Sequence, residues 1–351
     1  MSVKILIGDV MERIKELPDN SVDCCVTSPP YWGLRDYGVD GQIGMEPTPE
    51  LHIKALVAVF AEVRRVLKPD GTLWLNYGDM YACAPNGRAA KDVVGDDRTY
   101  RDKPFSTAVC GYKPKDLILM GARLAMALQS DGWYLRNEII WSKPNAMPES
   151  VKDRCAVCHE KIFLFAPSPR YYFDYEAVKE PIAALVGGQK QHKNALSFER
   201  EVNEPERPGH KDKRHRSGKG NNKSFCGGGV YTNNRAFCNS SDNHKETIGN
   251  KTNESGLRLR RSVWVVPTKG FKEAHFATFP PDLIRPCILA GCPAGGTVFD
   301  PFGGAGTTAL VAEQCGRNAV VIELNPNYAA MSKARISEDC GLFGAVEVSS
   351  M

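Results

Sequence analysis

The stretch TVFDPFGGAGTTALVAEQCGRNAVVIELN, residues 297–325, carries the pattern that decides the fold. A short apolar run at 297–299 comes first, a glycine-rich turn follows and opens a helical pattern, and a second apolar run ends at Glu323. This order predicts a strand, a tight turn, a helix and a second strand, which form a βαβ unit. Because such crossovers join parallel strands, the stretch predicts a mainly parallel sheet with helices on both faces.

Strand and helix patterns also alternate through the first part of the chain. The stretches KILIGDV, residues 4–10, and VDCCVTS, residues 22–28, predict short buried strands, and residues 50–67 place apolar side chains at helical spacing. The β-rich runs at 133–143 and 161–174 are expected to form an adjacent strand pair. The fold class is therefore α/β, with a doubly wound, mainly parallel sheet.

One segment differs from this scaffold in charge and composition. Residues 187–261 contain 16 Lys and Arg against 8 Asp and Glu, a net charge of +8. Because the whole chain has a net charge of +4, the rest of the chain carries −4. The segment is rich in Gly, Asn, Ser and Lys and is expected to be partly disordered. It predicts a basic module for a polyanion, inserted between parts 1–186 and 262–351, although a solvated loop is the alternative interpretation.

The glycine-rich turn predicts a cofactor that contains a nucleoside. Residues 304–309, GAGTTA, fit the G-x-G-x-x-A form, and the free N–H groups at the start of the helix favour an anionic group. Glu323 can accept hydrogen bonds from both ribose hydroxyls. The pattern alone fits a nicotinamide dinucleotide or S-adenosylmethionine, or a tight turn that binds nothing. Asp300 argues against a dinucleotide, since it would repel a pyrophosphate but could pair with an amino group.

A second loop, TSPPYW at residues 27–32, follows another predicted strand. Because the carboxyl ends of parallel strands meet at one crevice, this loop should face the glycine-rich turn. The Ser28 hydroxyl, the Pro29 carbonyl and the flat Tyr31 ring suit an exocyclic amino group on a planar base. Two acceptors would free the nitrogen lone pair to attack a sulfonium methyl group, and Tyr31 would stack on the extruded base. A turn with packed aromatic side chains is the alternative.

TSPPYW and DPFGGAGTT together resemble the amino-directed DNA methyltransferases, in the β order of their motifs. The resemblance covers residues 1 to about 180 and 262–330 but not 187–256. It implies a fold of the S-adenosylmethionine-dependent methyltransferase type, S-adenosylmethionine as cofactor, and target recognition by residues 187–261. It further implies double-stranded DNA as the partner, a monomer or homodimer, and the cytoplasm of a bacterial or phage-infected cell. No membrane association is expected, because no apolar run is long enough to span a bilayer.

The resemblance also assigns roles to individual residues. It implies that Ser28, Pro29, Pro30 and Tyr31 hold and activate the base. The residues implied for the cofactor are Asp9, Thr278, Phe279, Pro280, Asp300, Phe302, Gly304, Gly306, Thr307 and Glu323. The residues expected to contact DNA, from their type and position in the basic segment, are Arg214, Arg216, Lys219, Lys223, Asn233 and Arg235.

No metal is expected. Cys155 and Cys158 have zinc-like spacing, but Cys226 and Cys238 would have to complete the site from a loop.

The first residue of the catalytic loop bears on the target base. Ser-Pro-Pro-Tyr resembles the loop that is usual in the cytosine-N4 enzymes, whereas Asp-Pro-Pro-Tyr is usual in the adenine-N6 enzymes. We therefore expect N4 of cytosine within a short duplex target, with adenine N6 as the alternative. An RNA methyltransferase, an inactive DNA-binding protein and a dinucleotide oxidoreductase are further alternatives.

Overall fold

The computed structural model describes residues 1–34, 38–39, 41–82, 111–181, 256–268, 279–340 and 345–350. The chain divides into two compact units, one formed by Met1–Lys179 with Leu259–Met351 and the other by Glu180–Arg258. In the second unit the described residues form an antiparallel pair, β6 (Glu180–Pro181) and β7 (Leu257–Arg258). Thr278 and the residues expected to contact DNA, Arg214, Arg216, Lys219, Lys223, Asn233 and Arg235, lie outside the described residues.

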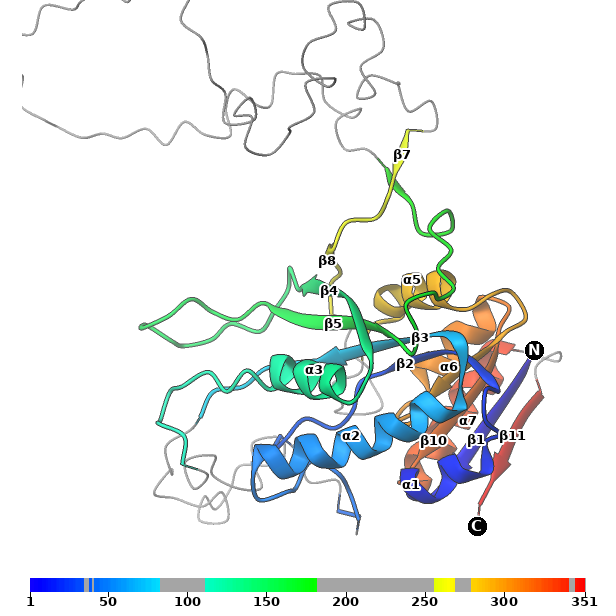
Figure 1. Ribbon diagram of the computed structural model, residues 1–351, viewed down its shortest axis with the longest axis horizontal. Helices are drawn as coiled ribbons and strands as arrows, with labels where there is room; N and C mark the ends of the chain where they lie inside the picture. The colour runs from blue at the N-terminus through cyan, green and yellow to red at the C-terminus, as the bar shows by residue number, and fades with distance from the viewer. Residues whose placement is uncertain are drawn as a thin grey trace, which may run out of the picture. The chain divides into compact units, whose positions relative to one another are not determined.

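The first unit contains a sheet in the order β11-β1-β10-β9-β2-β3-β5-β4-β8 (Figure 1). Neighbouring strands are parallel except at β5, which runs antiparallel to both β3 and β4. The strands are β1 (Ser2–Ile7), β2 (Val22–Thr27), β3 (Leu67–Tyr77), β4 (Tyr134–Ser142), β5 (His159–Ala166), β8 (Val263–Val265), β9 (Thr297–Asp300), β10 (Asn318–Glu323) and β11 (Ala345–Ser349). The predicted mainly parallel sheet is confirmed, as is the pairing of the two β-rich runs.

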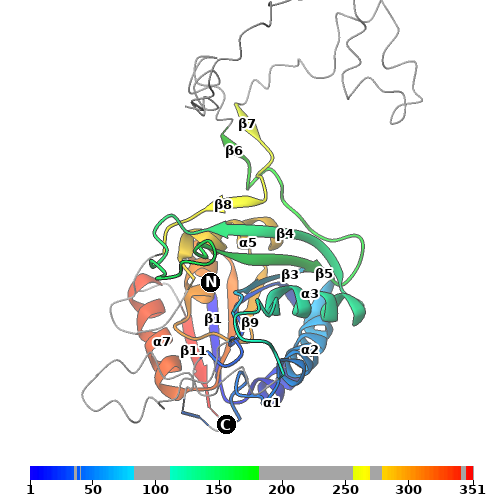
Figure 2. The same ribbon diagram turned by 90° about the vertical axis from the view of Figure 1, so that its left-hand side faces the viewer.

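Helices cover both faces of this sheet (Figure 2). The buried side chains of α1 (Val10–Arg13), α2 (Pro49–Val66) and α3 (Met120–Ser130), with the 3₁₀ turn η1 (Ile14–Glu16), join one core cluster. Those of α5 (Pro281–Gly291), α6 (Thr307–Gln314) and α7 (Pro326–Cys340) join a second cluster. The layers form because each helix has one apolar face to bury.

Local sequence explains where α2 begins and which face it buries. The Thr48 hydroxyl accepts a hydrogen bond from Leu51 N at 3.3 Å, and Pro49 occupies the first turn, where its missing N–H is not needed. Leu56, Phe60 and other apolar residues at helical spacing are fully buried. The helix ends at Val66, so β3 begins directly after it.

The order of the strands sets the place where a ligand can bind. The chain leaves β9 through α6 to β10 on one side, and leaves β2 through α2 to β3 on the other. The sheet therefore reverses its winding between β9 and β2, and open α/β sheets bind ligands at this kind of switch point. The loop after β9 is the glycine-rich turn, and the loop after β2 is TSPPYW.

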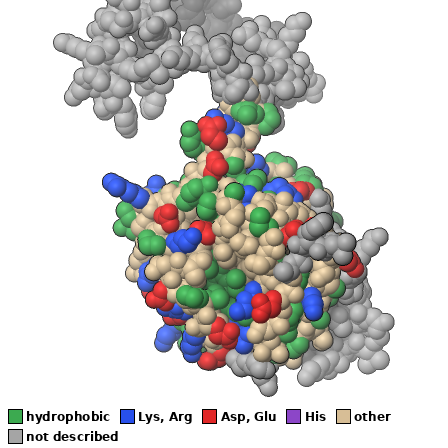
Figure 3. All heavy atoms as spheres, turned by 90° about the vertical axis from the view of Figure 1, so that its right-hand side faces the viewer, with side chains coloured by type: hydrophobic (Ala, Val, Ile, Leu, Met, Phe, Trp, Pro, Cys, Tyr) green, Lys and Arg blue, Asp and Glu red, His purple; other side chains and the backbone are tan. Residues whose placement is uncertain are grey.

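On the face that Figure 3 shows, acidic and basic side chains are interspersed without a large patch of one sign. Among the described helices, none is long and apolar enough to cross a membrane. Trp74, Trp133 and Trp141, which the sequence places on strands, are buried at 2–3% exposure, although Trp133 comes one residue before β4.

Candidate functional site

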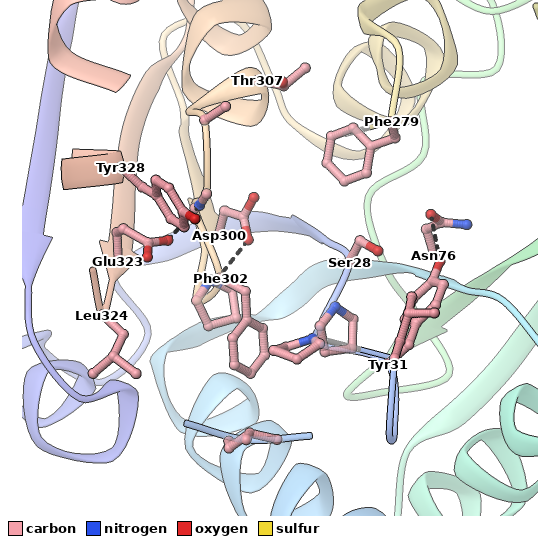
Figure 4. A pocket seen from close by; sticks show the side chains of 18 of the residues that line it. Ser28, Tyr31, Asn76, Phe279, Asp300, Phe302, Thr307, Glu323, Leu324 and Tyr328 are labelled. Atoms are coloured by element: carbon pink, nitrogen blue, oxygen red, sulfur yellow. Dashed lines mark hydrogen bonds between the residues drawn. The ribbon is translucent and has the colours of Figure 1, made fainter. Parts of the chain in front are cut away.

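A cavity of about 670 Å³ lies at the carboxyl edge of the parallel strands and is lined by both predicted loops. The loops adjoin because β2 and β9 pair side by side, with Cys25 opposite Phe299. Figure 4 shows two ends of this cavity. Glu323, Leu324 and Tyr328 lie at one end, Tyr31 and Asn76 at the other, and Asp300, Phe302 and Ser28 between them.

Asp300 connects the two loops. Its Oδ1 accepts hydrogen bonds from Thr27 Oγ1 at 2.6 Å and Phe302 N at 3.0 Å, and its Oδ2 accepts one from Thr308 Oγ1 at 2.6 Å. Burial raises the pKa of this carboxyl group, although all three donors act to lower it. The carboxyl group lines the cavity as predicted, but its internal donors make it a brace between β2 and the glycine-rich turn.

The Glu323 carboxylate lies at one end of the cavity. Its Oε2 accepts a hydrogen bond from Gly304 N at 2.7 Å, and its Oε1 accepts one from Asn325 N at 2.8 Å. Burial raises the pKa of the Glu323 carboxyl group, and the two backbone donors oppose this rise. Each oxygen retains a lone pair, so the pair fits the two hydroxyls of a ribose.

The two motif glycines have different surroundings. Gly304 lines the cavity at φ +51°, and a Cβ there would meet nothing within 4 Å. Gly306 does not line the cavity, and at φ +73° its Cβ would lie 2.0 Å from Ser332 Oγ in α7. Pro280, buried at the start of α5, is also absent from the cavity lining, whereas Thr307 contributes to it. The structure thus brings Gly304 and Thr307 to the site, but not Gly306 or Pro280.

Apolar and aromatic side chains also line the cavity. Of the predicted residues, Phe302 lies between the two ends and Phe279 lies on the side of Ser28 and Asn76 (Figure 4). Leu324 and Tyr328, which sequence reasoning missed, lie at the Glu323 end. Asp9 also lines the cavity, and its Oδ1 accepts hydrogen bonds from the backbone at the start of α1. This mixture of flat apolar surface and a few carboxylates fits an adenosine that carries a sulfonium chain.

Tyr31 lines the opposite end with a fixed orientation. Its hydroxyl donates to Glu160 Oε2 at 2.9 Å, and its ring centroid lies 4.7 Å from that of Tyr77. The ring edge adjoins Gly78, where a Cβ would lie 2.7 Å from Tyr31 Cε2. Burial and the nearby Glu160 raise the pKa of the Tyr31 phenol. The ring that was predicted to stack on a base is therefore already packed against Tyr77.

The Glu160 carboxylate accepts hydrogen bonds from three side chains, a cluster that sequence reasoning did not predict. Besides Tyr31, Asn76 Nδ2 donates to its Oε2 at 3.2 Å, and the Lys143 ammonium pairs with its Oε1. Lys143 Nζ also lies 4.2 Å from the ring centroid of Trp141. Asn76 could have been found, because it comes near the end of β3, beside β2. Glu160 begins an antiparallel strand, so only the pairing of β5 with β3 brings it to this edge.

A row of hydrogen-bonded, mostly buried side chains supports the TSPPYW loop. His52, 0% exposed, makes hydrogen bonds through Nδ1 to Glu46 Oε2 at 2.8 Å and through Nε2 to the Tyr77 hydroxyl at 2.9 Å. The Tyr77 hydroxyl in turn accepts a hydrogen bond from Trp32 N at 3.3 Å. Burial acts to raise the pKa of Glu46, but the bond from His52 and backbone donors hold it below its ordinary value.

Ser28 and Pro29 supply oxygens between the two ends of the cavity. Both residues line it, and Ser28 is half-buried. Within the described residues, no donor is bonded to the Pro29 carbonyl. Two oxygen acceptors next to an apolar wall can hold the two hydrogens of an amino group. Pro30 lines the same wall, so all four predicted residues of the catalytic loop meet at the cavity.

The cysteines do not assemble into a metal centre in the part of the chain that the structure describes. Cys155 and Cys158 are exposed, and no group of three or more His, Cys, Asp or Glu side chains with a suitable arrangement occurs among the described residues. Cys226 and Cys238 lie outside the described residues.

Comparisons with known sequences identify relatives along nearly the whole chain. A family model described as DNA methylase matches residues 22–334. The type II methyltransferase M.XycI of Xanthomonas campestris pv. cyanopsidis is 43% identical over 94% of this chain and 86% of its own length. The type II methyltransferase M.SmaI of Serratia marcescens is 40% identical over 95% of this chain and 91% of its own length.

Solved structures share the fold. PvuII DNA methyltransferase (cytosine-N4-specific) aligns with a TM-score of 0.57 at 16% identity, over 99% of this chain and 95% of that chain. A protein of Thermus thermophilus described as a DNA modification methylase, in complex with S-adenosyl-L-methionine, aligns with a TM-score of 0.53 at 21% identity, over 99% of both chains. These likenesses confirm the predicted fold type.

Proposed function

The chain belongs to the DNA methylase family, whose model matches residues 22–334, and we propose that it transfers a methyl group from S-adenosylmethionine to N4 of cytosine in duplex DNA. One observation carries this proposal. A single cavity is lined at one end by Glu323 and the glycine-rich turn and at the other by Ser28, Pro29 and Tyr31. A cofactor and an extruded base can therefore meet within one cavity.

S-adenosylmethionine fits the residues at the Glu323 end, and when bound it supplies an electrophilic methyl group. Glu323 would accept the ribose hydroxyls, and Leu324 and Tyr328 would contact the apolar parts beside it. Phe279 would contact the part of the cofactor nearer Ser28. The brace at Asp300 fixes the distance between the two loops, because its carboxyl group bonds Thr27 at the start of one loop and the Phe302 backbone in the other. The chain thereby holds the methyl donor and the target base at a fixed separation.

Ser28 and Pro29 would activate the base. The Ser28 hydroxyl and the Pro29 carbonyl would each accept one hydrogen of the exocyclic amino group, which turns its lone pair out of conjugation with the ring. Transfer of the methyl group leaves a cationic nitrogen, which then loses one proton towards solvent. The chain contributes position and oriented dipoles, and no covalent bond to the protein is needed.

The basic segment is the proposed DNA-binding part. Its net charge of +8 over residues 187–261 suits phosphate contacts, which Arg214, Arg216, Lys219 and Lys223 would make. Asn233 and Arg235 are the proposed readers of base edges. The relatives' names, type II methyltransferases, support a site-specific activity of the restriction–modification kind in a bacterial cytoplasm.

Nucleoside mass spectrometry tests the proposal. Unmethylated duplex DNA is incubated with the protein and S-adenosylmethionine, digested and searched for methylated bases. N4-methylcytosine is expected, N6-methyladenine would place the target on adenine, and methylation of structured RNA alone would make the chain an RNA methyltransferase. Ser28→Ala should lower the rate by about 10²-fold without loss of cofactor binding, while Ser130→Ala at the exposed end of α3 should not. The absence of any methylated base would refute the proposal.

A further inference from the structure

The loop between β4 and β5, residues 143–158, projects beyond the end of the sheet (Figure 1). It forms one lip of the cavity. Its lining residues are Lys143, Ala146, Met147, Pro148, Glu149 and Val157. The lip lies at the Tyr31 end, since Lys143 contacts Glu160, which bonds Tyr31.

The loop is held in place just before Met147. Asn145 Nδ2 donates to Thr268 O at 2.9 Å, and Asn145 Oδ1 accepts from Thr268 N at 2.8 Å. The base of the loop is closed by Lys143 N, which donates to Cys158 O at 2.8 Å. These bonds anchor the approach to residue 147 on two separate segments of the chain.

The loop is also held just after Met147. Glu149 Oε2 accepts hydrogen bonds from Arg154 Nη1 at 2.6 Å and from Val157 N at 3.4 Å. The Arg154 guanidinium lies 3.9 Å from the ring centroid of Tyr81. Hydrogen bonds on both sides of Met147 thus hold the loop.

Met147 itself is 86% exposed, more than any other large hydrophobic residue among the described residues. Met126, at 66%, is also exposed, but it lies on α3 and does not line the cavity. A fixed loop that presents a long, unbranched apolar side chain to water at the mouth of a cavity indicates a surface that is covered when the cavity is in use.

We infer that Met147 enters the base stack of the DNA and fills the gap left by the extruded target base. The inference rests on the proposed function, because a base must leave the duplex to reach Ser28 and Pro29. When the base leaves, the apolar faces of its two neighbouring bases are exposed, and the base opposite it on the other strand is left unpaired. An apolar side chain inserted between base steps covers these faces and delays the return of the target base.

The test compares two duplexes that carry the target site identified by sequencing of methylated DNA. One is fully paired, and the other has an abasic position opposite the target base, which therefore extrudes without a pairing partner. Met147→Gly should lower the methylation rate on the paired duplex by about 10-fold but change the rate on the other duplex by less than about 2-fold. Met147→Leu should retain the rate, and Met126→Gly on α3 is the matched control.

The outcomes separate this inference from the proposed function. If Met147→Gly loses activity equally on both duplexes, or on neither, the inserting role is refuted while the methyltransferase assignment stands. If the unaltered protein methylates neither duplex, the proposed function is refuted, and the inference falls with it. Unchanged cofactor affinity of Met147→Gly, measured by calorimetry, checks that the variant is folded.

Discussion

Gly306 offers the sharpest test of how the structure assigns the glycine-rich turn. The motif predicts a cofactor-binding glycine, whereas the structure packs Gly306 against α7. A Cβ at this position would lie 2.0 Å from Ser332 Oγ, 2.9 Å from Ser332 Cβ and 3.3 Å from Ile336 Cδ1. We predict that Gly306→Ala destabilises the protein but leaves the cofactor affinity of the folded fraction nearly unchanged.

The magnitude follows from two contributions. An alanine at φ +73° adopts the left-handed region, which costs roughly 1–2 kcal/mol. The Ser332 hydroxyl can rotate away, but the 2.9 Å contact with its Cβ requires the helices to move apart, and such overpacking costs about 1–3 kcal/mol. The free energy of unfolding should therefore fall by about 2–5 kcal/mol.

Two further variants separate these contributions. Ser332→Gly removes both close atoms, so the double variant should recover the overpacking part, about 1–3 kcal/mol, and keep the backbone part. Gly304→Ala is the matched control within the motif. It has a similar φ of +51° and open space, but it lines the cavity. It should lose about 1–2 kcal/mol of stability and, unlike Gly306→Ala, lose cofactor affinity.

Urea unfolding followed by circular dichroism measures the stabilities, and calorimetry with S-adenosylmethionine measures the affinities. The reasoning is refuted if Gly306→Ala is as stable as the unaltered protein, or if Ser332→Gly does nothing to relieve it. It is also refuted if Gly306→Ala folds normally and weakens the cofactor as much as Gly304→Ala does.

Three more predictions concern the polar groups around the cavity. His52→Phe should lower the free energy of unfolding by roughly 2–4 kcal/mol in urea titrations, because Glu46 and Tyr77 each lose a buried partner, and His52→Gln should recover part of it. Burial raises the pKa of Asp300, so the native state holds this proton more tightly than the unfolded chain does. The stability of the unaltered protein relative to Asp300→Asn should therefore fall as the pH rises above the ordinary value of 3.8, and equal curves at all pH values would contradict this. Glu160→Gln removes the charge that pairs with Lys143 and should reduce kcat, measured by methyl transfer, by about 10-fold. Cofactor affinity, measured by calorimetry, should not change. A change in cofactor affinity alone would argue against the placement of Glu160 at the Tyr31 end of the cavity, where the base would bind.

Much of the site was predictable because its signals are local. The TSPPYW loop and the glycine-rich turn are each short strings at the ends of apolar runs, and parallel strands bring such ends together. Ser28, Pro29, Pro30, Tyr31, Gly304 and Glu323 therefore line one cavity as expected. Asn76, Leu324 and Tyr328 follow the same rule and could have been added from it.

The chain by itself thus determined the βαβ units, the parallel sheet and the two loops, since these depend on local periodicity and turn residues. Only the tertiary structure decided that Gly306 packs against Ser332, that Asp300 is a brace, and that Tyr31 bonds Glu160, which is 129 positions away. It also decided that Met147 stays in water while Trp141, six residues earlier, is buried. Such contacts depend on which strands pair and on which side chains the helices cover, and no short stretch of sequence encodes either one.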